Sequence, residues 1–121
     1  MGTIKQKVGL EGVRFFAYHG FYPEEQVLGT EFIVDVHTEL DVYSSGGDDI
    51  ANTVNYERLH QIISEEMKTP RKLLETVAYG ILDQIRHEFL TVQNIRVSIR
   101  KMHPPLGGDV RNSLIELSFN R

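Results

Sequence analysis

Alternation of apolar and polar residues in "NIRVSIRKMHPPLGG", residues 94–108, constrains the fold more than any other feature of the chain. Successive side chains of a β-strand point to opposite faces, so Ile95, Val97 and Ile99 form an apolar row that faces a core. The next residue in this row is Lys101, just before "HPP" ends the strand. The pattern therefore predicts a half-buried strand whose last core-facing residue is a lysine.

Three further segments have the patterns of strands. They are residues 8–18, with Gly12 as a possible bulge, residues 31–42 and residues 113–120. Residues 31–42 alternate most regularly, which is typical of an antiparallel strand with one buried face. The segments 19–30 and 44–55 are expected to be loops.

Two amphipathic helices are expected in the middle of the chain. Asn55 is a candidate N-cap for the first helix, which runs to about Lys68. The second is expected to start at Thr69-Pro70, with Thr69 as the cap and Pro70 in the first turn. Its apolar residues follow helical spacing: Leu74, Val77, Ala78, Ile81, Ile85 and Phe89.

The element order β-β-α-α-β-β predicts one two-layer α+β domain over residues 1–121. In it, two helices cover one face of a four-stranded antiparallel sheet. The other face and both sheet edges stay open, and open edges are prone to pair with further strands. We therefore expect a homo-oligomer.

Composition excludes several classes of partner. The net charge is −4 and the 13 Lys and Arg residues are scattered, so we expect no nucleic-acid partner. No long apolar segment occurs, so we expect no membrane span. The absence of cysteine excludes disulfides and is compatible with the cytoplasm, where we expect the protein.

The familiar motifs of catalysis are missing. The five histidines never form H-x-H or H-E-x-x-H, so no metal is expected, and a metal site assembled across the fold is the alternative that stays open. No other cofactor is expected. No nucleotide-binding glycine motif and no G-x-S-x-G elbow occurs either.

Polar residues in unusual places are the remaining candidates for a site. Lys101 could extend to the rim of the sheet, or partial burial could lower its pKa so that it accepts a proton. Glu75 lies at the border of a helical apolar stripe. It is either solvated or able to accept paired hydrogen bonds from a planar amidine-like group.

Four further residues are candidates of the same kind. Glu24 and Glu25 lie in the loop after "YHG", where glutamates are usually solvated. Tyr56 is expected to begin a helix and either packs on the core or passes a proton. His19 precedes Gly20 at the end of a strand, where a histidine is more often an ordinary loop residue than a catalytic base.

Together these positions resemble one family, the dihydroneopterin aldolases of folate biosynthesis. The resemblance rests on four blocks in order: "GVRFFAYHGFYPEEQVLGTEFIVDV", "DDIANTVNYERL", "KLLETVA" and "VSIRKMHPP". It implies the tunnelling fold, in which sheets of four subunits close a barrel and two rings commonly stack into an octamer. It also implies pterin pockets between subunits and metal-independent retro-aldol cleavage of 7,8-dihydroneopterin, with epimerisation at C2′ in many members.

The resemblance assigns roles by position. Glu75 corresponds to the pterin anchor, and Lys101 to the essential lysine that acts as base or proton relay. Glu25 corresponds to the loop glutamate that pairs with the lysine. Tyr56 corresponds to a tyrosine that a neighbouring subunit contributes to protonate the enamine intermediate. Val54 and Leu74 flank these positions and are expected to offer backbone groups or walls to the substrate.

One departure and two alternatives remain open. The chain has "LGGD" where many members have a "P-G-H" turn, so the pocket rim is expected to differ. A 2′-epimerase of dihydroneopterin triphosphate is one alternative, although the loops "HGFYPEEQ" and "HPPLGGD" lack the basic groups that three phosphates require. The other alternative is a non-catalytic pterin-binding oligomer.

Overall fold

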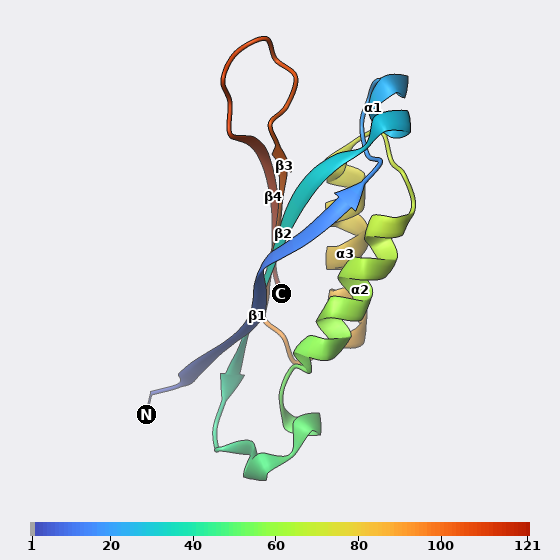
Figure 1. Cartoon of the computed structure of the whole chain (residues 1–121). Coiled ribbons are helices and arrows are strands. Elements are labelled where there is room, and N and C mark those ends of the chain that lie inside the picture. The colour runs from blue at the N-terminus through green and yellow to red at the C-terminus, as the bar shows by residue number, and fades with distance from the viewer. Residues whose placement is uncertain (1) are drawn as a thin grey trace.

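The computed structural model describes residues 2–121 and contains one antiparallel sheet with the strand order β1-β2-β3-β4. Its strands are β1 (Ile4–Ala17), β2 (Thr30–Val42), β3 (Asn94–Met102) and β4 (Asn112–Asn120). Helices α2 (Tyr56–Lys68) and α3 (Leu74–Glu88) lie side by side on one face of the sheet (Figure 1). The predicted α+β class and the order β-β-α-α-β-β are confirmed.

Both predicted loops contain short helical segments. Residues 19–30 include α1 (Pro23–Leu28), while residues 44–55 include the 3₁₀ turns η1 (Gly46–Asp48) and η2 (Ile50–Asn52). A helix of six residues is too short for apolar periodicity to reveal it. The prediction that these segments have no helical structure is therefore wrong.

Helix α2 begins as predicted, but α3 does not. The Asn55 side chain accepts a hydrogen bond from the Glu57 N–H at 2.9 Å, which confirms the predicted cap. Helix α3 begins at Leu74 and not at Thr69-Pro70. The backbone of Arg71 bonds to the residue pair His19-Gly20, so this stretch follows tertiary contacts in place of a helix.

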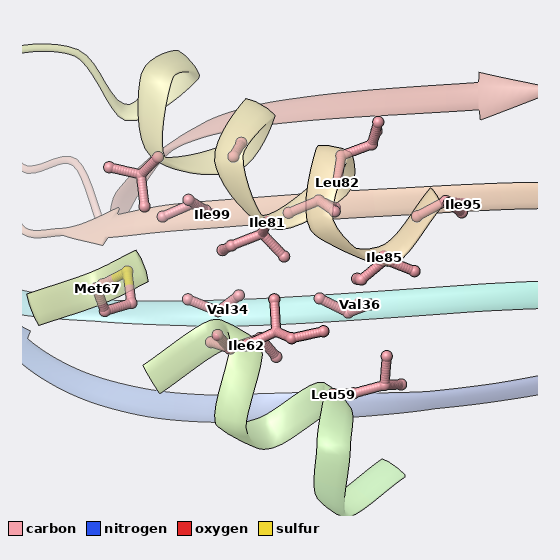
Figure 2. Packing of buried hydrophobic residues seen from close by; sticks show 14 of the residues in the cluster. Val34, Val36, Leu59, Ile62, Met67, Ile81, Leu82, Ile85, Ile95 and Ile99 are labelled. Atoms are coloured by element: carbon pink, nitrogen blue, oxygen red, sulfur yellow. The ribbon is translucent and has the colours of Figure 1, made fainter. Parts of the chain in front are cut away.

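The core lies between the sheet and the two helices (Figure 2). Ile95, Val97 and Ile99 of β3 are at most 1% exposed, as their alternation predicts. Burial of each such side chain stabilises the fold by roughly 1.5–3 kcal/mol. The helices contribute residues at helical spacing: Leu59, Ile62, Ile63, Met67, Val77, Ala78, Ile81, Leu82 and Ile85.

A bulge interrupts the pairing of β1 with β2. The register shifts between Leu10 and Val13, and Gly12 has a φ of +70°. This left-handed conformation favours glycine, and the Gly12 N–H donates to Asp35 Oδ1 at 2.6 Å. The predicted bulge at Gly12 is confirmed.

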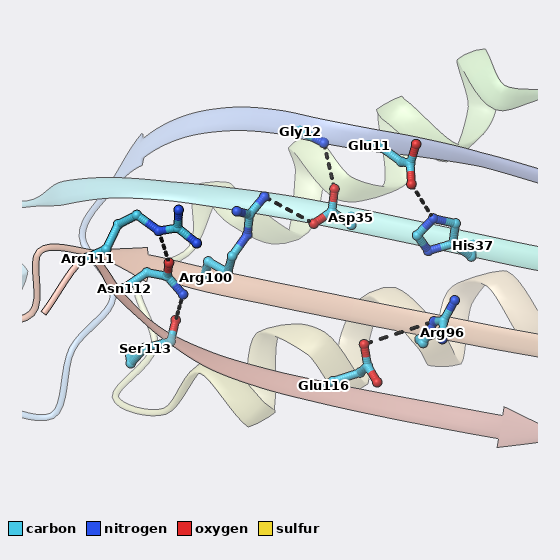
Figure 3. Close-up of polar contacts among 10 residues, drawn as sticks. All are labelled: Glu11, Gly12, Asp35, His37, Arg96, Arg100, Arg111, Asn112, Ser113 and Glu116. Atoms are coloured by element: carbon cyan, nitrogen blue, oxygen red, sulfur yellow. Dashed lines mark hydrogen bonds and ion pairs between the residues drawn. The ribbon is translucent and has the colours of Figure 1, made fainter.

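The uncovered face of the sheet is polar (Figure 3). Arg100 Nη2 lies 3.4 Å from Asp35 Oδ2, and His37 Nε2 lies 2.9 Å from Glu11 Oε2. Arg100 therefore lies on the face opposite to the core, as strand parity predicts.

Candidate functional site

Lys101 is the last core-facing residue of β3. In the sheet register it lies opposite Phe32 of β2 and Ser113 of β4. Its side chain is 14% exposed, and its ammonium group forms an ion pair with Glu25 Oε2. The lysine therefore does not extend into solvent at the rim but meets a carboxylate from α1.

Local geometry holds Glu25 in place. Its Oε1 accepts a hydrogen bond from the Tyr22 N–H at 3.2 Å, so one carboxylate oxygen caps α1 while the other faces Lys101. Pro23 at the first helical position favours the same turn. The two oxygens of one side chain thus link a helix start to the end of a strand.

Gly20 makes room for this glutamate. A Cβ at Gly20 would lie 2.7 Å from Glu25 Cδ, which is closer than such atoms pack. The Gln26 side chain also donates to the Gly20 carbonyl at 2.9 Å. The glycine of "YHG" is therefore required for the close approach of Glu25, a steric role that the sequence alone did not indicate.

Burial lowers the pKa of Lys101, because the ammonium form loses hydration. An ionised Glu25 acts in the opposite direction, since it favours the charged amine. Such a pair can hold a proton and release it to a neighbouring group, which is what general acid–base chemistry requires.

A pocket of about 300 Å³ opens beside the pair. This volume is at the lower limit of pockets that hold small molecules. Four of its lining residues were not predicted from the sequence: Leu28, Gly29, Thr30 and Pro105, although Pro105 is the last residue of the "HPP" that ends β3. The remaining lining residues are Glu24, Glu25 and Lys101.

Glu75 and Leu74 form the first turn of α3, at the same end of the sheet as α1 and the loop after β3 (Figure 1). Glu75 is exposed, and within residues 2–121 its carboxylate forms neither a hydrogen bond nor an ion pair. Both of its oxygens are therefore available to a ligand. Leu74 is half-buried and packs against the core.

Tyr56 and Val54 lie at the other end of the molecule, where η1 and η2 lead into α2 (Figure 1). Tyr56 is 59% exposed, whereas Val54 is buried. Asn55 and Glu57, the neighbours of Tyr56, line a separate cavity of about 570 Å³. A single chain therefore does not bring Tyr56 to Lys101.

Residues 2–121 contain neither a candidate metal centre nor a candidate membrane-spanning helix. No group of three or more His, Asp or Glu side chains lies in an arrangement that could hold a metal ion. No helix in this part of the chain has the length and apolar character needed to cross a membrane.

Sequence comparison finds one family along almost the whole chain. The family model of dihydroneopterin aldolase (FolB) matches residues 8–118. A dihydroneopterin aldolase of Bacillus subtilis is 37% identical over 114 residues, covering 93% of this chain and 95% of the relative. One from Streptococcus pyogenes serotype M18 is 34% identical over 117 residues, covering 95% and 98%.

Solved structures share the fold. Escherichia coli dihydroneopterin aldolase in complex with neopterin superposes with a TM-score of 0.80 at 17% identity, over 95% of this chain and 99% of that chain. Uricase from Arthrobacter globiformis gives a TM-score of 0.67 at 13% identity, over 97% of this chain and 49% of that one. The same fold thus occurs in enzymes with different names, so the fold alone does not identify the activity.

Proposed function

The chain belongs to the dihydroneopterin aldolase family, and we propose that it cleaves 7,8-dihydroneopterin into 6-hydroxymethyl-7,8-dihydropterin and glycolaldehyde. The single observation that supports this most strongly is the Lys101–Glu25 ion pair beside a pocket. A retro-aldol reaction has to remove a hydroxyl proton and later return a proton to carbon, and this pair offers a group suited to that task.

The reaction balances without a further reactant. Lys101, directly or through a water molecule, takes the proton from the C2′ hydroxyl as the C1′–C2′ bond breaks. The bonding electrons move into the C=N bond of the dihydropterin, which gives an enamine. Tyr56 helps to return a proton to C1′. The ring itself is the electron sink, so the step needs neither a metal nor a lysine Schiff base.

Glu75 is the proposed anchor of the pterin ring. Its two free oxygens are suited to the ring's amino group and the adjacent N–H, a paired hydrogen bond to a charged acceptor. Leu74 lies next to it and would form part of the pocket wall. The anchor and the Lys101–Glu25 pair lie at the same end of the sheet, so one substrate could contact both.

The second half of the site is proposed to come from a neighbouring subunit, in a homo-oligomer of four or eight copies. Tyr56 and Val54 lie at the opposite end of the molecule from Lys101, and the outer edges of strands β1 and β4 have no partner strand within residues 2–121. Large apolar side chains that are more than 60% exposed would gain from such contacts: Ile4, Phe16, Phe21, Tyr22, Val27, Leu28, Tyr43, Ile50, Leu90 and Leu106.

Glycolaldehyde release tests the activity. The purified protein is incubated with 7,8-dihydroneopterin in the presence of a chelator, and we expect glycolaldehyde and hydroxymethyldihydropterin in equal amounts. No turnover would contradict the proposal, and binding without turnover would favour a non-catalytic pterin-binding protein. Parallel assays for the C2′ epimer, from both dihydroneopterin and its triphosphate, measure epimerase activity.

We also propose that the chain is one domain and works in the cytoplasm.

A further inference from the structure

His19 is a buried polar residue for which the proposed reaction has no role. It is 1% exposed, and its ring packs edge-on against Phe32 with the ring centres 5.4 Å apart. Phe32 in turn lies opposite Lys101 in the sheet register. A histidine in this position is therefore next to the site, but it does not line the pocket.

The histidine and the glycine after it hold the backbone of one distant residue. His19 Nδ1 accepts a hydrogen bond from the Arg71 N–H at 3.1 Å, and the Gly20 N–H donates to the Arg71 carbonyl at 2.9 Å. The two bonds join segments that are 52 positions apart in the sequence. Glu25 follows shortly after one segment, and Glu75 follows shortly after the other.

We propose that His19 is a positioning residue, which fixes the pterin anchor Glu75 relative to the Lys101–Glu25 pair by accepting the Arg71 N–H. This rests on the proposed function, because it assumes that the substrate contacts both groups. Misplacement of reacting groups by about 1 Å can cost roughly 100-fold in rate, so a rigid link between the two parts of the site would favour turnover.

The geometry also sets the protonation of the ring. Nδ1 can accept from the Arg71 N–H only if it carries no proton, so the neutral ring has its proton on Nε2. Burial lowers the pKa of His19, and the nearby positive charges of Arg71 and Lys101 lower it further, while the Met67 carbonyl opposes the shift. Burial and the two cations thus favour the neutral ring that the link requires.

Two substitutions at His19 distinguish the role of its hydrogen-bond acceptor from the role of its aromatic ring. His19→Phe keeps an aromatic ring against Phe32 and removes the acceptor, whereas in His19→Asn the side-chain oxygen can replace Nδ1. We expect kcat to fall about 10- to 100-fold in the Phe variant, with a smaller change in KM, and to stay within roughly fivefold of wild type in the Asn variant. A folded Phe variant with wild-type kcat, or equal losses in both variants, would overturn the proposal.

Thr38→Val is the matched control. Thr38 is 1% exposed, and its hydroxyl donates to the Val8 carbonyl at 2.6 Å. Its substitution also removes a buried hydrogen bond, but one without a link to Arg71. We expect a lower Tm and an unchanged kcat, so a purely structural effect is distinguished from a positioning effect.

A measurement on the wild-type protein covers the case in which the Phe variant does not fold. Nitrogen-15 NMR of the imidazole ring at neutral pH should show a proton on Nε2 and none on Nδ1. A protonated Nδ1 would overturn the proposal. Failure of wild-type protein to cleave dihydroneopterin would contradict the proposed function, whereas the ring tautomer is measured without substrate and therefore tests the His19 link separately.

Discussion

Lys101 and Glu25 form an ion pair although 76 positions separate them in the sequence. Both side chains are at most 16% exposed, so water screens the pair less than it screens a surface ion pair. Removal of one partner leaves a partly buried charge alone, which is costly. The pair therefore determines both the chemistry expected of the site and the effect of mutations there.

Lys101→Met should abolish most of the turnover while the pterin still binds. Loss of a general acid–base group typically lowers kcat by about 100- to 10,000-fold, and we expect a change of neopterin Kd of no more than about threefold. Steady-state kinetics and calorimetric titration measure the two quantities. Lys5→Met is the control, because Lys5 also pairs with a carboxylate, Asp41 at 2.6 Å, but on the exposed part of the sheet. A Lys101 variant with nearly normal kcat would contradict the assigned role.

Glu75→Gln should weaken binding more than it changes the fold. Replacing one carboxylate oxygen with an amino group leaves a donor of the pterin ring unpaired, which costs about 1–3 kcal/mol of binding free energy. The free energy of unfolding should change little, because Glu75 is exposed and has no partner within residues 2–121. Neopterin Kd and urea unfolding are the measurements, with Glu65→Gln on α2 as the control. Unchanged affinity would place the anchor elsewhere.

Gly20→Ala should disturb the site through a steric contact. The added methyl group would lie 2.7 Å from Glu25 Cδ, so Glu25 has to shift, and its pairing with Lys101 should be disturbed. We expect a loss of stability of about 1–3 kcal/mol, together with a large fall in kcat. Gly2→Ala is a suitable control because nothing lies within 4 Å of the added atom. Normal kcat in Gly20→Ala would show that the position of Glu25 does not matter.

Mixing two inactive variants should restore activity if the site is shared between subunits. Lys101→Met and Tyr56→Phe remove groups from the end of β3 and the start of α2, which lie at opposite ends of the molecule. After joint refolding in equal amounts, random assembly should give intact sites in about one quarter of cases, since each site takes each group from a different copy. Activity in the mixture is compared with that of each variant refolded alone. No recovery in mixed oligomers would indicate that both groups act from one chain.

Stability should fall below pH 6.5 because His19 is buried. Its pKa lies below the ordinary value of 6.5, so between these two values the unfolded chain binds more protons than the folded chain. The free energy of unfolding therefore rises with pH across this window and decreases as pH falls through it. Urea unfolding at fixed protein concentration measures the slope. His19→Asn should have a smaller slope than wild type, and identical slopes would contradict the prediction.

Much of the fold follows from local patterns. Parity along residues 95–101 correctly predicts the buried row of β3, and the cap at Asn55 correctly predicts the start of α2. The predicted start of α3 at Thr69-Pro70 is wrong, because a Thr-Pro pair only expresses a local preference for a helix start. The bonds from His19 and Gly20 to Arg71 outweigh it, and no local pattern contains them.

The sequence by itself determined the β-β-α-α-β-β order, the face on which Lys101 leaves the strand and the resemblance that assigns its partner. These depend on strand parity, on helical period and on short motifs, all of which act over a few residues. Only the tertiary structure decided that α1 brings Glu25 to the lysine and that Gly20 makes room for it. It also decided that Tyr56 lies at the opposite end of the molecule from Lys101. Such contacts join segments tens of residues apart, and they form only when burial of the shared core brings those segments together.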